Sequence, residues 1–130
     1  MEQRTHKRID ARLCGTPIEL APGRAKVELA MLSEMAADDS GLVHGGFVFG
    51  LADYAAMLAI NDPNVVLGAS ETRFLKPVLI GDMLIAEARL ESEQGKKRFV
   101  KVEVRRGADV VATADCTCFV PARHVLDSVS

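Results

Sequence analysis

The longest apolar run of the chain, Phe47 to Ile60, contains one charged residue, Asp53. The run is rich in Ala, Leu and Met, is longer than a typical strand, and is closed by Asn61-Asp-Pro63, so it predicts a helix. Because this helix is apolar all round, we expect it to be buried on nearly every side. It is shorter than the roughly 20 residues that span a bilayer, which indicates a core helix.

Alternating apolar and polar positions predict strands before and after this helix. Thr16 to Leu32 is expected to form a hairpin that turns at Pro22-Gly23. Four more strands are expected after the helix: Val65 to Phe74, Leu84 to Glu91, Val100 to Arg105, and Val110 to Val120. The predicted order is a hairpin, one buried helix, and an antiparallel meander of three or four long strands. A sheet of this length should curl around the helix in an α+β architecture.

Length and composition indicate one domain over residues 1–130. Hydrophobic residues make up 48% and charged residues 26% of the chain, as in ordinary globular proteins. The formal net charge of -2 argues against general nucleic-acid binding, which needs a basic surface. The first ten residues are charged and lack the apolar core of a secretory signal, so we expect a cytoplasmic protein without a membrane partner.

The three cysteines, Cys14, Cys116 and Cys118, are odd in number and lack Cys-x-x-Cys spacing, which favours reduced thiols. The alternation after Val110 puts Val110, Cys116 and Cys118 on one apolar strand face, where the thiols act as small hydrophobic groups. The chain has no His-Glu-x-x-His spacing and no phosphate-binding glycine loop. We therefore expect neither a metal nor a bound cofactor.

Four motifs carry a family resemblance: Gly41-Leu-Val-His-Gly-Gly46, Leu51-Ala-Asp-Tyr54, Phe74-Leu-Lys-Pro77 and Gly81-Asp82. The chain resembles the hotdog-fold acyl-CoA thioesterases, in particular their phenylacetate-type, 4-hydroxybenzoyl-CoA thioesterase-like branch. The resemblance implies a sheet wrapped around one helix and a homodimer as the working unit; whether two dimers pair into a tetramer is left open. It also implies that the thioester carbonyl lies at the helix N-terminus of one subunit and that the other subunit supplies the catalytic carboxylate.

The long helix offers two groups that suit thioester hydrolysis, which needs an activated water or nucleophile and donors for the developing oxyanion. Gly45 is the candidate amide donor at the helix N-terminus, and Gly46 beside it leaves room for substrate. Asp53 is the candidate general base or nucleophile, and the sequence leaves that choice open. The two groups are about 12 Å apart along a helix, yet both must reach one reacting centre. If both are catalytic, they must come from different subunits.

Other polar residues near the start of the helix have more than one interpretation. His44 could act as an acid or base, although the resemblance implies that it orders the loop before the helix. Asp38 stands where related thioesterases carry an asparagine that orients water or the carbonyl. It is either a catalytic-site residue or an exposed loop aspartate. His6 and His124 belong to no recognisable constellation and are expected at the surface.

Two more groups could contact the substrate. Ser70 is the candidate polar residue opposite Asp53, with Thr72 as the second choice; both are expected on one face of their strand. Lys76 and Arg123 are the candidates for binding the phosphates of coenzyme A.

The sequence is compatible with three functions. The first is an acyl-CoA thioesterase that works without metal or cofactor. The second is a non-catalytic acyl-CoA sensor, although the short N-terminal segment leaves little space for a DNA-reading helix-turn-helix. The third is a hydratase or dehydratase, which needs a second acid or base, and the sequence shows no convincing one beside Asp53. The acyl group is not predicted.

Overall fold

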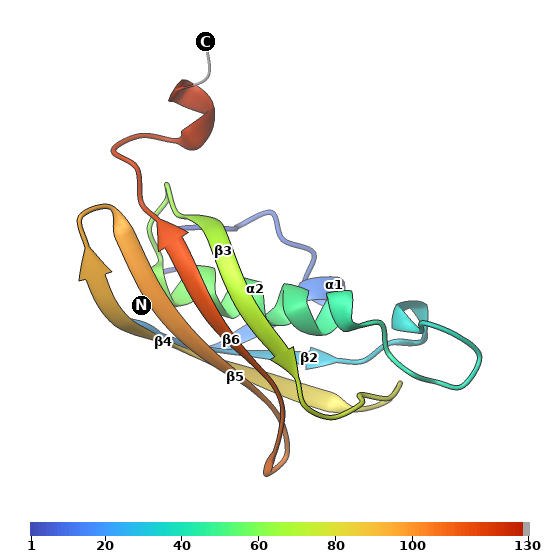
Figure 1. The fold of residues 1–130 in the computed structure, drawn as a ribbon. Helices are drawn as coiled ribbons and strands as arrows, with labels where there is room; N and C mark the ends of the chain where they lie inside the picture. The colour runs from blue at the N-terminus through green and yellow to red at the C-terminus, as the bar shows by residue number, and fades with distance from the viewer. Residues whose placement is uncertain (129–130) are drawn as a thin grey trace.

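One long helix, α2 (Gly45–Ile60), packs against a six-stranded antiparallel sheet in the computed structural model, which describes residues 1–128 (Figure 1). The strands are β1 (Thr16–Ala21), β2 (Arg24–Ala30), β3 (Val66–Phe74), β4 (Met83–Gln94), β5 (Lys97–Arg106) and β6 (Asp109–Phe119). The other helical elements are short: α1 (Ala11–Cys14) and the 3-10 helices η1 (Ser33–Met35) and η2 (Val125–Ser128). The predicted α+β architecture, a curved sheet around one helix, is confirmed.

The strands are arranged in the order β1-β2-β4-β5-β6-β3. The predicted hairpin is β1 and β2, and the predicted meander is β4, β5 and β6. β3 follows α2 in the chain but pairs with β6 rather than with β4. It is therefore an edge strand, and within residues 1–128 its outer edge is unpaired.

The apolar run forms the core helix α2, as predicted. Every residue from Tyr54 to Ala59 is buried. The helix ends at Asn61, which adopts a left-handed conformation (φ 54°) and donates its amide to the Met57 carbonyl at 2.8 Å. Asparagine is one of the few non-glycine residues that tolerate this conformation. Among residues 1–128, no helix is long and apolar enough to cross a membrane.

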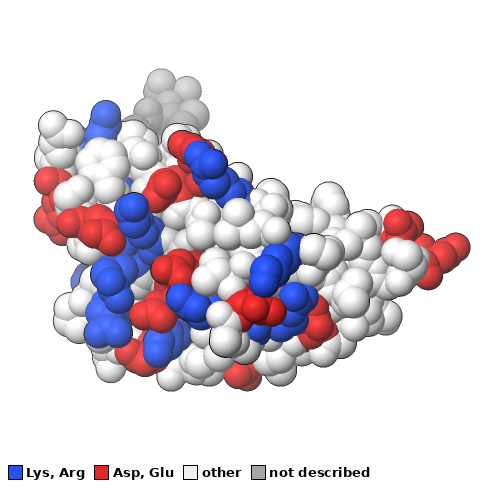
Figure 2. Space-filling model, turned by 60° about the horizontal axis from the view of Figure 1, so that its bottom comes forward, with Lys and Arg blue, Asp and Glu red and all other residues white. Residues whose placement is uncertain are grey.

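The two faces of the sheet differ in polarity, as the alternation predicts. Val100, Val102 and Val104 of β5 are almost completely buried against the core, whereas the residues between them are charged. On the face seen in Figure 2, lysine and arginine side chains are interspersed with aspartate and glutamate rather than gathered into one basic tract. Ion pairs such as Lys101–Asp115, at 3.8 Å, are exposed and contribute little to stability.

A β-bulge between β5 and β6 corrects one predicted strand face. Val104 pairs with Ala112, but Arg105 pairs with Val110, so Val111 is an extra residue between them. The prediction that Val110 shares the apolar face with Cys116 and Cys118 is wrong because the bulge turns Val110 to the other side. Cys116 and Cys118 themselves are buried in the core, as predicted.

Candidate functional site

Backbone hydrogen bonds to two other segments fix the loop that leads into α2. The His44 amide donates to the Met35 carbonyl at 2.9 Å, and the Val43 amide donates to the Val78 carbonyl at 2.8 Å. The side chain of His44, which is the N-cap residue of α2, makes no capping hydrogen bond. The position of the helix N-terminus therefore depends on the backbone rather than on a capping side chain.

The first amides of α2 are available to a ligand. The Phe47 amide donates to the His44 carbonyl at 3.1 Å, but no acceptor within residues 1–128 binds the amides of Gly45 and Gly46. A Cβ atom on Gly45 would lie 3.3 Å from Phe74 Cε1, and one on Gly46 would lie 2.8 Å from His44 Nε2. Glycine thus avoids crowding at both positions, and the positive end of the helix dipole faces open space.

A cavity of about 290 Å³ lies beside Gly45. Its lining is formed by Leu42, Val43, Gly45, Val48, Phe74, Leu75, Lys76, Pro77 and Val78. Phe74 and Leu75 are unusually exposed for large apolar residues, at 56% and 54%. The cavity combines apolar walls with unpaired amides, a combination that suits an apolar ligand carrying one polarised oxygen.

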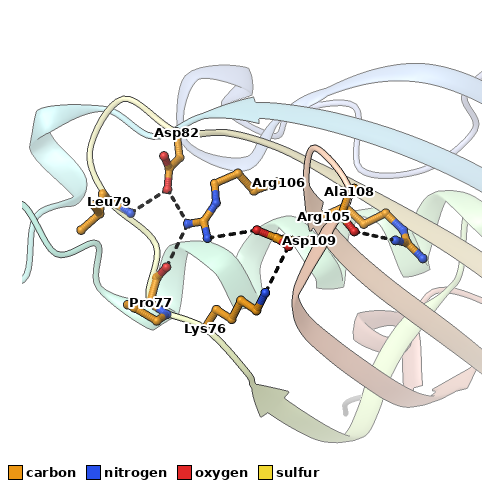
Figure 3. A network of polar contacts seen from close by, with 8 residues as sticks. All are labelled: Lys76, Pro77, Leu79, Asp82, Arg105, Arg106, Ala108 and Asp109. Atoms are coloured by element: carbon orange, nitrogen blue, oxygen red, sulfur yellow. Dashed lines mark hydrogen bonds and ion pairs between the residues drawn. The ribbon is translucent and has the colours of Figure 1, made fainter.

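An arginine from β5 fixes the loop that forms one wall of this cavity (Figure 3). Arg106 Nη1 donates to the Pro77 carbonyl at 3.0 Å and to Asp82 Oδ2 at 2.9 Å. The same carboxylate oxygen accepts from the Leu79 amide at 2.9 Å. These donors, the Leu79 amide first, hold the pKa of Asp82 below its usual value. The loop between β3 and β4 therefore has a defined arrangement.

Lys76 lies at the rim of the cavity beside Gly45, but it already has a partner. Its Nζ lies 3.1 Å from Asp109 Oδ1, and Figure 3 shows Asp109 bridging Lys76 to Arg106. Lys76 and Asp109 are about half exposed, at 48% and 54%, and such pairs are weak. The role of Lys76 in phosphate binding stays a prediction, which requires only that this weak pair open.

Asp53 is the one charged residue of α2, and its carboxylate is poorly satisfied. Its Oδ1 atom is buried and has no hydrogen-bond partner within residues 1–128. Burial raises the pKa of this carboxyl, and the charge of His6 opposes the shift. A carboxylate that lacks stabilising donors binds a proton more tightly, which is the property of a general base.

A second cavity, of about 400 Å³, contains Asp53. Its lining is formed by Thr5, His6, Asp53, Met57, Pro63, Val65, Val66, Leu67 and His124. It shares no lining residue with the cavity beside Gly45. Within one chain, the two candidate catalytic groups therefore face different spaces, in agreement with the expected 12 Å separation along the helix.

His6 and His124 were expected at the surface, outside any constellation. His124 is exposed, as predicted, whereas His6 is half-buried, and both line the cavity that contains Asp53. Burial lowers the pKa of the His6 imidazole, and the charge of Asp53 opposes the shift. An imidazole therefore lies in the same cavity as Asp53, which the sequence did not indicate. No sequence spacing could have linked Asp53 to His6, because the two residues are far apart in the chain and share a cavity only in the folded protein.

Ser70 and Thr72 share one face of β3, as predicted. Ser70 Oγ lies 2.7 Å from Thr72 Oγ1, and Cys116 Sγ lies 3.9 Å from Ser70 Oγ. Ser70 also pairs with Cys116 in the sheet register. Burial is the main cause of the raised pKa of Cys116; the hydrogen bond to Ser70 opposes this shift, and the charge of Asp53 adds to it.

The remaining candidates, Asp38, Arg123 and His44, line neither of the two cavities. Asp38 is an exposed loop residue whose Oδ1 accepts from the amide and hydroxyl of Ser40; these bonds, the hydroxyl first, lower its pKa. Arg123 is exposed near the C-terminus and lines neither cavity. His44 is exposed, and its ring meets Phe47 edge-on at 6.1 Å between centroids. Catalytic or binding roles for these three residues remain predictions.

Several curated proteins are similar to this chain in sequence. It is 51% identical over 111 residues to a methylthioribose-1-phosphate isomerase from Aquifex aeolicus, covering 85% of this chain and 24% of that protein. A predicted esterase from Archaeoglobus fulgidus is 32% identical over 114 residues, covering 85% and 71%. The transcription factor FapR from Caldanaerobacter subterraneus is 26% identical over 98 residues, covering 75% and 49%. The chain thus spans about a quarter of the isomerase and half of FapR.

Solved structures and a family model agree on the fold. An uncharacterised protein from Pyrococcus horikoshii superposes with a TM-score of 0.96 and 54% identity, over 98% of each chain. The PaaI protein of the phenylacetic acid degradation operon of E. coli superposes with a TM-score of 0.79 and 25% identity, over 86% of this chain and 83% of PaaI. Residues 40–113, which include α2 and Asp53, match the model of the thioesterase superfamily. The chain therefore belongs to the thioesterase superfamily and has its hotdog fold.

Proposed function

We propose that the protein hydrolyses an acyl-CoA thioester to the free acid and coenzyme A, and that it works as a homodimer. The observation that carries this proposal is the buried, unpaired oxygen of Asp53 on the same helix as the unpaired amides of Gly45 and Gly46. Membership of the thioesterase superfamily supports a thioester as the substrate.

In the proposed reaction, Asp53 removes a proton from water, and the water oxygen attacks the carbonyl carbon of the thioester. The carbonyl oxygen becomes negative and accepts a hydrogen bond from the amide of Gly45 in the other subunit. The carbon–sulfur bond then breaks, and coenzyme A leaves as its thiolate. The alternative is direct attack by Asp53 through an anhydride. If water then attacks the aspartyl carbonyl of the anhydride, a single turnover in ¹⁸O-labelled water leaves label in the Asp53 carboxylate, which the general-base route never does.

Two features support the homodimer. The first is the unpaired outer edge of β3, which a second copy could pair with, as exposed edge strands tend to do. The second is the exposure of Phe74 and Leu75 at the end of that strand. A two-fold axis that places the α2 helices of two subunits antiparallel would bring each Asp53 toward Gly45 of the partner subunit. Association of such dimers into a tetramer stays a prediction.

Other residues are assigned roles in substrate binding because of where they lie relative to Asp53 and Gly45. Ser70, with Thr72 beside it, is the candidate polar contact opposite Asp53, supported by their common neighbour Cys116. Lys76 is the candidate contact for a coenzyme A phosphate because it lies at the rim of the cavity beside Gly45.

The test is a hydrolysis screen with short, long and aromatic acyl-CoAs, in which the released thiol is measured. Asp53→Asn is expected to lower kcat by about 10² to 10⁴, the usual contribution of a general base. Asp115→Asn is the matched control because Asp115 is exposed on the outer face of the sheet, where it pairs only weakly with Lys101. Wild-type turnover by Asp53→Asn would rule out the mechanism.

A non-catalytic acyl-CoA sensor is the second candidate, and the similarity to FapR favours it. This function predicts tight binding of an acyl-CoA without release of free coenzyme A. Calorimetry and the thiol assay on the same sample separate the two functions. Binding without turnover by the wild-type protein would support the sensor and exclude the thioesterase.

A further inference from the structure

The N-terminal segment, residues 1–10, is attached to the C-terminal end of α2 by the side chain of Asn61. Asn61 Oδ1 accepts from the Arg4 amide at 2.7 Å, and Asn61 Nδ2 donates to the Glu2 carbonyl at 2.8 Å. Gln3 Nε2 also donates to the hydroxyl of Tyr54 at 3.0 Å. Figure 1 shows the segment running past α2 and leading into α1. These contacts fix the chain immediately before Thr5 and His6.

His6 is held in one orientation by its backbone and by its neighbour. It has a positive φ of 54°, which is uncommon for a residue with a side chain and often marks a functional position. Its Nδ1 atom lies 2.8 Å from Oγ1 of Thr5, which is buried. The Nε2 atom of the ring has no hydrogen-bond partner among residues 1–128, and His6 is one of the residues that line the cavity.

The imidazole of His6 and the carboxylate of Asp53 line the same cavity of about 400 Å³. They make no hydrogen bond to each other, and Asp53 Oδ1 is unpaired. A cavity of this size has room for a substrate atom or a water molecule between the two groups. The arrangement resembles a pair of acid–base groups placed around a reacting centre.

We propose that His6 is a second acid–base group of the site, which acts through Asp53 by accepting the proton that Asp53 removes from water. The inference rests on the proposed thioesterase function. The water oxygen forms a bond to the carbonyl carbon, the carbon–sulfur bond breaks, and sulfur leaves with the electron pair. The proton passes from water to Asp53, then to the His6 imidazole, and finally to the thiolate or to solvent. Each turnover thus restores ionised Asp53 and neutral His6.

The surroundings suit this transfer. Burial lowers the pKa of His6, which keeps the resting imidazole neutral, and raises the pKa of Asp53. The two shifts bring the pKa values of the groups closer together, as reversible proton transfer between them requires. Other titratable groups line this cavity or interact with Asp53: His124 just before η2, Tyr54 on α2, Cys14 on α1, and Cys116 and Cys118 on β6. Burial raises the pKa of the thiols, that of Cys118 to about 12, so they stay protonated near neutral pH.

His6→Asn tests the inference, because asparagine tolerates a positive φ but cannot accept the proton. We expect kcat to fall about tenfold to hundredfold, at the lower end of general acid–base contributions, with little change in KM. The pH profile of kcat should also lose the limb that belongs to His6. Lys7→Asn is the matched control because Lys7 is an exposed neighbour in the same segment. In His6→Gly, added imidazole should restore part of kcat.

The outcomes separate this inference from the proposed function. Loss of activity in Asp53→Asn with a normal kcat and pH profile in His6→Asn would overturn the role of His6 alone. Absence of hydrolysis by the wild-type protein would overturn the proposed function and, with it, the step assigned to His6. An NMR titration tests the pair without turnover: the His6 pKa should be lower in Asp53→Asn than in the wild type. An identical His6 pKa in the two proteins would also overturn the inference.

Discussion

Two functional regions of α2 are positioned in different ways: the first is the helix N-terminus at Gly45, and the second is the surroundings of Asp53. At the N-terminus, Gly45 is placed by backbone hydrogen bonds from Val43 and His44 to neighbouring segments. Around Asp53, the surroundings come from side chains: Asn61 holds the N-terminal segment, and that segment brings His6 to the carboxylate. An oxyanion donor requires only a well-placed amide, whereas a base requires controlled burial and a neighbouring group.

The largest effect is expected in a subunit-mixing experiment, which tests whether Gly45 and Asp53 of one site come from different subunits. Gly45→Pro removes the candidate amide, yet proline is favoured at the first position of a helix. We expect Gly45→Pro and Asp53→Asn each to lower kcat by about 10² or more. Gly45→Ala, which keeps the amide, should lose much less.

Mixed dimers of the two inactive variants should recover activity. If Gly45 and Asp53 act across the dimer, each mixed dimer contains one site in which both residues are intact. Random co-expression makes half of the dimers mixed, so about one quarter of the wild-type activity should return. Absence of recovery in purified mixed dimers would mean that both groups act within one chain.

Removal of the Asn61 side chain tests the second region. Asn61→Gly keeps the left-handed conformation but leaves the Arg4 amide and the Glu2 carbonyl without their partner. We expect a loss of about 1–2 kcal/mol in the free energy of unfolding, measured by urea denaturation. Asn61→Ala should lose about 1 kcal/mol more, because alanine is strained at a positive φ.

The same variants should leave the first region intact. The N-terminal residues should become sensitive to limited proteolysis in Asn61→Gly, while the loop around Gly45 keeps its protection. Equal protection of residues 1–10 in the variant and the wild type would argue that Asn61 does not fix this segment.

A smaller effect is expected at the wall of the cavity beside Gly45. Arg106→Gln removes the donors to Pro77 and Asp82 and should lower the free energy of unfolding by about 1 kcal/mol. Arg105→Gln is the matched control: Arg105 pairs with Glu103 and contacts the Ala108 carbonyl at 3.5 Å, but it does not reach the loop (Figure 3). Equal losses in the two variants would show that the loop does not depend on Arg106.

The contribution of the Arg106–Asp82 ion pair to stability also depends on pH. The pKa of Asp82 is depressed in the folded protein, so its contribution is complete above the unfolded value and is lost as pH falls through the folded value. Wild-type Tm should therefore fall more steeply than that of Asp82→Asn as pH is lowered below about 4. A parallel fall in both proteins would contradict this assignment.

The first region could be predicted from the sequence, and most of the second could not. The apolar run and its capping residues identify α2, and the two glycines identify its open N-terminus. Both signals are local. His6, by contrast, lies in the cavity of Asp53, and its segment is held by a hydrogen bond between Arg4 and Asn61, which are 57 residues apart. No periodic pattern in the sequence marks such a contact. His6 also lies outside residues 40–113, which match the family model.

The fold shows the same limit on a smaller scale. Strand alternation predicts the faces of β5 correctly, but the bulge at Val111 reverses the face of Val110. Such a bulge adds one residue without changing the apolar pattern. Likewise, the sequence suggests that β3 is the first strand of the meander, but β3 pairs with β6. The connection through α2 decides which strand β3 pairs with, and strand alternation does not show it.

The smallest expected effect is the loss of folding stability that the ionised Asp53 carboxylate causes. Its pKa is raised in the folded protein, so the native state favours the protonated carboxyl and ionisation at neutral pH opposes folding. Asp53→Asn should therefore raise Tm at pH 7, by the equivalent of about 1 kcal/mol or less. This gain should shrink as pH falls through the raised pKa, because the wild-type carboxyl then becomes neutral too. Asp115→Asn, at an exposed position, should show no such gain. A lower Tm for Asp53→Asn at pH 7 would mean that the carboxylate has stabilising partners in the dimer, and the basis for treating it as a poorly satisfied base would be lost.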